Sequence, residues 1–176
     1  MTDLSSRLEQ LSPAKRALLE KLAARGGAPP AADVVRPREG SGPAPLSFGQ
    51  QRLWFLDRLQ PGTPLYTIPA AFWLRGRLDV RALRAALGEV VSRHEALRTV
   101  FREVEGTPLQ LVLPSMPVTV EVADLHALPE PARGAEAERR VRDFLRLPFD
   151  LARGPLLRAF AAREGEEDWT LAIGVH

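Results

Sequence analysis

Apolar positions along the chain follow two different periods, which predict a mixture of helices and strands. A period of three to four residues places apolar side chains on one face of residues 79–93, with Asp79 at the N-cap. Residues 47–59 show the same spacing, with Ser47 as the N-cap. Residues 132–146 form a third, more charged segment in which Glu and Arg recur at i,i+4 spacing. Three helices are therefore expected.

Alternating apolar residues, separated by turn signals, predict the strands. Pro69 lies inside the first of them, so that strand is expected at a sheet edge or at a bulge. Residues 105–108 and 164–167 are polar and contain Gly, which predicts two hairpin turns. Helices mixed with several hairpins favour an α+β fold with a largely antiparallel sheet. The expected strands are 66–78, 97–104, 109–113, 118–122, 156–163 and 168–176.

The first 45 residues differ in character from the rest. Leucines recur at helical spacing in residues 4–25, and Gly26-Gly27 provide a stop, so this segment is predicted to be helical. Residues 26–45 are rich in Gly, Pro and Ala without a period, which is typical of a linker. The main domain is expected to span residues 46–176.

Composition excludes several classes of function. The 176 residues are 45% hydrophobic and 26% charged with a formal charge of only +2, and basic residues are interleaved with acidic ones, so no nucleic-acid partner is expected. There is no cysteine, which removes disulfides and thiolate chemistry. No secretory signal, membrane-length apolar run, phosphate loop or metal-ligand cluster is apparent. We expect a cytoplasmic protein without membrane contact, bound metal or bound cofactor.

Arg93, His94, Glu95 and Arg98 concentrate charge where a helix is expected to give way to a strand. Either arginine has the planar donors to bind a carboxylate or a phosphate. The alternative, which we favour, is an internal network of ion pairs and hydrogen bonds, with Glu95 as a candidate partner. His94 is interpreted as a residue that helps to end the helix.

His176 is the strongest candidate for chemistry among the three histidines. It follows a predicted strand, and side chains at strand ends often reach a cleft. His126 lies at an ordinary exit from a strand into a loop and carries no functional prediction.

Three motifs together carry a resemblance to a known family. Ser47 to Leu56 resembles the S-x-A-Q-x-R-L-W-x-L motif of nonribosomal peptide synthetase condensation domains through Ser47, Gln50, Arg52 and Trp54, with Gly49 where Ala is usual. Arg93 to Phe101 matches the R-H-E-x-L-R-T-x-F box of the same family. Residues 147–158 resemble its P-F-D-L-x-x-G-P-L-L-R segment. The resemblance covers residues 46–176.

The resemblance implies a chloramphenicol acetyltransferase-like fold of two lobes around a tunnel, of which this chain would be the N-terminal lobe. The implied reaction joins a carrier-bound acyl or peptidyl thioester to the amine of a carrier-bound amino acid. Upstream and downstream carrier domains and an adenylation domain are the implied partners, and phosphopantetheine belongs to the carriers. His176 would be the first, mainly structural His of the H-H-x-x-x-D-G signature. The catalytic second His would follow it, so we expect the isolated chain to be inactive.

Other functions of the same fold stay open. An epimerisation domain retains the double His, and a free-standing acyltransferase is also compatible. A heterocyclisation domain, which has an Asp-rich signature, is disfavoured by His176. A different class is a docking fragment that contacts a carrier domain through residues 4–25.

Overall fold

The computed structural model describes residue 40 and residues 42–176. The helix expected over residues 4–25 lies outside the described residues, and so does most of the expected linker 26–45. The described elements belong to one structural unit, Ser41–His176.

The three expected helices are confirmed. Helix α3 spans Phe48–Leu59, α4 spans Val80–Arg93 and α5 spans Glu130–Arg146. The Asp79 carboxylate caps α4 by accepting hydrogen bonds from two backbone N–H groups, at 2.8 and 3.1 Å. Helix α5 begins two residues before the predicted start, at a proline-rich first turn without a side-chain cap.

Four of the strands form one mixed sheet in the order β2-β7-β6-β5. Their bounds are Ile68–Arg75 for β2, Val120–Asp124 for β5, Leu157–Arg163 for β6 and Asp168–Val175 for β7. Only the β5–β6 pair is parallel, so the expectation of a largely antiparallel sheet is confirmed. Strand β2 is an edge strand, which accounts for Pro69.

A second, three-stranded sheet has the order β1-β4-β3, from Ala44–Pro45, Thr107–Val112 and Thr99–Val104. The β3–β4 turn consists of Glu105 and Gly106, both with positive φ, so it is tighter than the four residues predicted. Strand β1 corrects the predicted linker, which included its two residues. Ala44 and Pro45 pair with Gln110 and Leu109 of β4, and the Pro45 carbonyl oxygen also accepts a hydrogen bond from the Gln110 side chain, at 2.9 Å.

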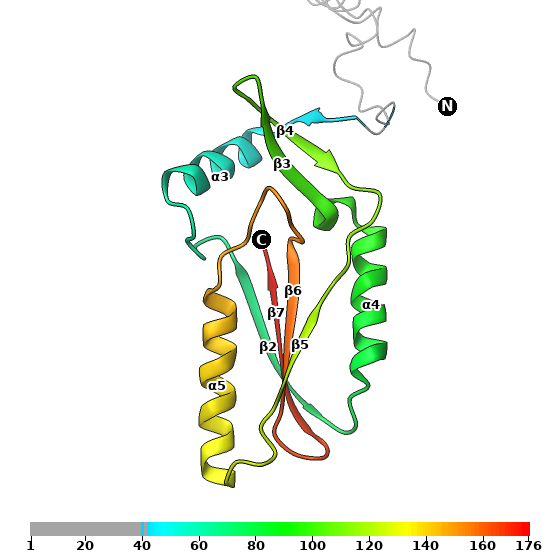
Figure 1. The fold of residues 1–176 in the computed structure, drawn as a ribbon, viewed down its shortest axis with the longest axis vertical. Helices are drawn as coiled ribbons and strands as arrows, with labels where there is room; N and C mark the ends of the chain where they lie inside the picture. Colours follow the sequence, from blue (N-terminus) through cyan, green and yellow to red (C-terminus); the bar gives the residue numbers. More distant parts are fainter. Residues whose placement is uncertain (1–39, 41) are drawn as a thin grey trace, which may run out of the picture. The chain divides into compact units, whose positions relative to one another are not determined.

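The hydrophobic core lies on both faces of the four-stranded sheet. Helix α4 packs on one face against Ala159, Ala161 and Leu171, whereas α5 packs on the other against Phe160 and residues of β5 and β7. Figure 1 shows the two helices flanking the strands. Because successive residues of β6 point to opposite faces, the run of alanines and Phe160 is buried from both sides. This burial fixes the direction of β7 and therefore the position of His176 at its end.

Candidate functional site

His176 is held at the end of β7 by one backbone hydrogen bond and one aromatic contact. Its N–H donates to the Leu156 carbonyl oxygen at 3.0 Å. Its ring meets the ring of Phe149 edge to face, with 5.8 Å between centroids. Burial of the half-exposed side chain lowers the pKa of His176, while the negative charge of Asp57 acts in the opposite direction. Burial therefore favours the neutral form of the imidazole.

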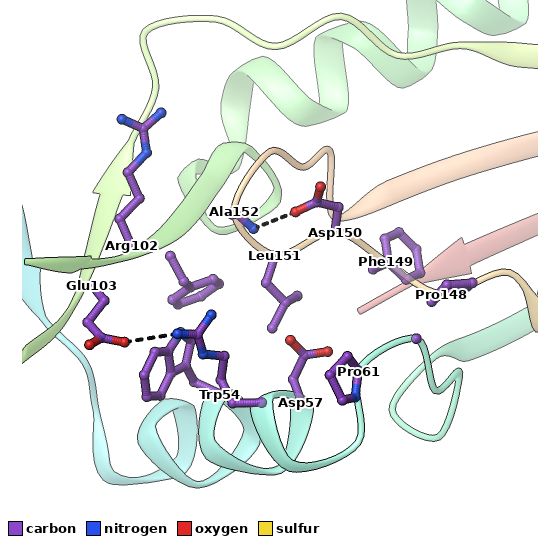
Figure 2. A pocket seen from close by; sticks show the side chains of 13 residues that line it. Trp54, Asp57, Pro61, Arg102, Glu103, Pro148, Phe149, Asp150, Leu151 and Ala152 are labelled. Carbon is purple, nitrogen blue, oxygen red and sulfur yellow. Dashed lines mark hydrogen bonds and ion pairs between the residues drawn. The ribbon is translucent and has the colours of Figure 1, made fainter. Parts of the chain in front are cut away.

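A cavity of about 660 Å³ lies beside this histidine. Helix α3 and the turn after it form one wall, β3 forms the second, and residues 148–152 form the third (Figure 2). Aromatic and apolar side chains, among them Trp54, Phe101, Phe149 and Leu151, alternate with charged ones. Phe149 lines the cavity and also contacts His176, so the cavity and the end of β7 form one site.

Most of the charged side chains of the cavity have a partner. Arg58 donates to Glu103 at 3.1 Å and lies over the ring of Trp54, 5.3 Å from its centroid. The Asp150 carboxylate accepts the Ala152 N–H at 2.9 Å. Asp57 differs, because no hydrogen bond or ion pair within the described part of the chain engages its carboxylate.

Arg158 supports the segment that carries Phe149. Its guanidinium lies 4.2 Å from the Phe149 ring centroid and donates to the backbone carbonyl oxygens of Leu147 and Pro148, the latter at 3.0 Å. Opposite it on β7, a Cβ on Gly174 would lie 3.5 Å from the Arg158 Nε. That distance is an ordinary van der Waals contact, so the arginine packs closely on β7, and its burial lowers the pKa of Arg158.

The opening motif of the sequence fixes α3 to the three-stranded sheet. The Ser47 hydroxyl accepts the Gln50 N–H at 3.3 Å, and the Gln50 side-chain oxygen accepts the Ser47 N–H at 2.8 Å, which completes a capping box. The Gln50 amide also donates to Gln110 of β4 at 3.1 Å. Trp54 reaches the cavity, whereas Arg52 lies exposed.

The charged block after α4 separates into exposed and internal residues. Arg93 is exposed and pairs with Glu89 at 2.7 Å. Exposed His94 forms the C-cap of α4. The Arg98 side chain is only 14% exposed and donates to the Leu113 carbonyl oxygen at 2.6 Å.

Arg98 also lies 3.7 Å from a carboxylate oxygen of Glu95. Because its guanidinium is engaged with protein atoms, the geometry favours the structural interpretation of Arg98 over anion binding.

Leu156 connects this block to the histidine. Its N–H donates to the Leu97 carbonyl oxygen at 3.3 Å, and its own carbonyl oxygen accepts the His176 N–H. The Phe101 N–H donates to the Leu151 carbonyl oxygen at 2.8 Å. Backbone hydrogen bonds thus join segments that are about fifty to eighty residues apart in the sequence.

Asp57, Phe149 and Arg158 were not among the predicted site residues. Phe149 and Arg158 lie in the third motif, residues 147–158, in which the sequence predicts no site residue. Nothing in the local sequence marks Asp57, because an aspartate on an amphipathic helix is ordinary. No group of metal-ligating side chains occurs among the described residues, and none of their helices is long and apolar enough to cross a membrane.

Comparison with known protein families and sequences gives consistent matches. The model of the condensation domain family matches residues 41–176. The chain is 43% identical over 178 residues to phosphinothricin tripeptide synthetase PhsC of Streptomyces viridochromogenes, covering all of this chain and 16% of the synthetase. It is 43% identical over 141 residues to chondramide synthase cmdD of Chondromyces crocatus, covering 80% of this chain and 4% of that synthase. The chain thus spans a small part of these relatives.

Solved structures resemble the fold. The starter condensation domain of rhizomide synthetase RzmA superposes with a TM-score of 0.69 at 25% identity, over 77% of this chain and 32% of that chain. SgcC5 of Streptomyces globisporus superposes with a TM-score of 0.62 at 35% identity, over 76% of this chain and 31% of that chain. The α+β fold of the chloramphenicol acetyltransferase-like type is thereby confirmed.

Proposed function

The chain belongs to the condensation domain family of nonribosomal peptide synthetases, and from this premise we propose that the intact domain forms an amide bond. The donor is an acyl or peptidyl thioester on one carrier domain, and the acceptor is the amine of an amino acid on another. The observation that supports this most is the cavity beside His176, where the motifs of the sequence converge.

The chemistry requires a base but no enzyme nucleophile. A thioester is already activated, so the amine can attack its carbonyl carbon once the ammonium has lost a proton. The C–N bond forms as the C–S bond breaks, and the phosphopantetheine thiolate of the donor carrier leaves and takes up the proton that the attacking nitrogen loses. In this proposal the second His of the H-H-x-x-x-D-G signature, which follows His176, accepts the proton of the ammonium. His176 holds the end of β7 in place through Leu156 and Phe149. No step needs a bound metal or a cofactor of this domain.

The partners and the setting follow from the same proposal. An upstream and a downstream carrier domain deliver the two substrates on phosphopantetheine, and an adenylation domain of the same synthetase loads the acceptor. The synthetase works in the cytoplasm. The 176 residues alone do not catalyse the reaction, because the second His and the opposite wall of the tunnel lie outside them.

A reconstituted assay tests the proposal. The domain completed from the parent gene is incubated with loaded donor and acceptor carriers, and the carrier-bound product is measured by mass spectrometry. Amide product from the complete domain, and none from the 176-residue chain, is expected. Turnover by the short chain would contradict the assignment of the base, and no product from the complete domain would contradict the reaction.

A further inference from the structure

We propose that Asp57 is a positioning residue that binds the protonated amine of the acceptor in the cavity beside His176. This inference rests on the proposed function, since it names a residue for the acceptor of that reaction. Asp57 makes no covalent bond in it. The carboxylate holds the ammonium until the base removes its proton.

The position of Asp57 follows from the docking of α3. The capping box and the Gln50–Gln110 hydrogen bond fix the first turn of α3 against β4. The next turns place Trp54 and Asp57 on the face that lines the cavity. Figure 2 shows the Asp57 carboxylate extending from α3 into the space below Leu151, beside Pro61.

The surroundings of Asp57 favour the binding of a cation. The side chain is half-buried in a cavity with Phe149 and the buried Leu151 on the opposite wall. A carboxylate that loses water without gaining a hydrogen bond or counter-ion costs free energy. Burial of this carboxylate is offset when a positive group of the substrate occupies the cavity.

Among the residues that the structure describes, no cationic side chain pairs with Asp57. Arg58 is engaged with Glu103 and Trp54. Arg102 is exposed, and its guanidinium extends away from the cavity in Figure 2. Within the described part of the chain, Asp57 is therefore the carboxylate of this cavity that is available to a ligand.

The location fits an amine better than another cation. Asp57 is close enough to His176 for its charge to raise the pKa of the histidine against the effect of burial. An ammonium held at Asp57 therefore lies next to the end of β7, where the proposed base follows in the sequence. No cluster of ligands suited to a metal ion is present among the described residues.

Binding of a small acceptor analogue to the full 176-residue chain tests this inference. The probe is leucyl-N-acetylcysteamine, and its N-acetyl derivative is the matched ligand without an ammonium. Chemical shift titration measures both dissociation constants for the wild type and for Asp57→Asn. We expect the substitution to weaken the free-amine probe about five-fold and to leave the acetylated probe unchanged.

Asp143→Asn is the control for a general loss of negative charge, because Asp143 pairs with Arg139 on α5, outside the cavity. It is expected to bind both probes like the wild type. In the same spectra, Asp57→Asn is expected to lower the pKa of His176, because it removes a charge that raises this pKa. This shift checks that Asp57 lies close to His176, whereas the comparison of the two probes distinguishes binding of the ammonium from a structural role.

Any other result of the titrations would contradict the inference. Equal weakening of both probes would mean that Asp57 acts on the fold and not on the ammonium. Unchanged binding of the free amine by Asp57→Asn, or no binding of it by the wild type, would exclude the ammonium site. This binding result is independent of the amide assay. The amine can bind at Asp57 when no amide is formed, and amide can form when the amine does not bind at Asp57.

Discussion

The β6–β7 hairpin and helix α3 have similar apolar content but opposite surroundings. In the hairpin, Ala161, Ala162 and Ala172 are completely buried, because α4 and α5 cover the two faces of the sheet. Helix α3 contains no buried residue, and its Phe48 is 92% exposed and its Phe55 56% exposed. The comparison teaches that apolar residues are buried only where a neighbouring element covers the face on which they lie.

The residues that identify the family do not all lie in the better covered region. The opening motif lies on α3, and Arg93 and His94 of the second motif are exposed. The buried hairpin consists largely of alanine and other apolar residues that many proteins share. The family motifs therefore lie around the cavity, whereas the buried hairpin stabilises the fold that keeps them in place.

Truncation of one aromatic residue in each region gives the largest contrast. Phe160, 6% exposed, packs against Phe144 with 5.5 Å between ring centroids. Phe160→Ala is expected to lower the free energy of unfolding by about 3–5 kcal/mol, because it leaves a cavity in the core. Phe55→Ala is expected to change it by less than about 0.5 kcal/mol. Urea unfolding measures both, and equal losses would remove the distinction between the two regions.

The two arginines of the second motif provide the next contrast. Arg98→Ala is expected to destabilise the fold by about 2 kcal/mol, because the Leu113 carbonyl oxygen loses a charged donor inside the protein. Arg93→Ala breaks only an exposed pair with Glu89 and should cost less than about 0.5 kcal/mol. Thermal unfolding of both variants at one pH checks the pair. A larger loss for Arg93→Ala would show that the exposed half of the motif carries the structure.

The third prediction concerns the end of the hairpin, where the covered region meets the cavity. Burial lowers the pKa of His176 below its ordinary 6.5. Phe149→Ala, which removes the ring beside it, is expected to raise this pKa toward 6.5 in an NMR titration. The sign for stability follows from linkage. The unfolded chain takes up the proton first, so stability falls as the pH drops from about 6.5 toward the folded pKa.

An unchanged His176 pKa in Phe149→Ala would show that another part of the site desolvates the imidazole. Phe55→Ala serves as the aromatic control, because Phe55 does not line the cavity.

The smallest expected effect lies on the exposed side of α5. Hydrogen bonds from Arg139 and Arg140 lower the pKa of Glu136 to about 2. Glu136→Gln should therefore be slightly less stable than the wild type above about pH 4.5. The difference should shrink as the pH falls from there and be largely gone near pH 2, where about half of the native carboxylates are protonated. Unfolding at a series of pH values with and without salt tests this, and a difference that persists undiminished at pH 2 would contradict it.

The fold was largely predictable from local patterns. Apolar periodicity predicted α3, α4 and α5, and alternation predicted the strands, because side-chain direction repeats with a fixed period in each element. Pro69 predicted a sheet edge or a bulge, because proline lacks the N–H that an interior strand requires, and the structure shows the edge. Pairing of Ala44 and Pro45 was missed, since it depends on β4, which lies more than sixty residues later.

The sequence by itself determined most of the elements, the caps of α3 and α4, and the family, because these depend on residues close together in the chain or on motifs that can be read directly. Only the tertiary structure decided which charges are internal, that Leu156 joins Leu97 to His176, and that Asp57 faces a cavity without a partner among the residues that the structure describes. The physical reason is that burial and charge pairing depend on neighbours distant in sequence. Arg93 and Arg98 carry the same chemical group, yet only packing placed one in water and the other among carbonyl oxygens.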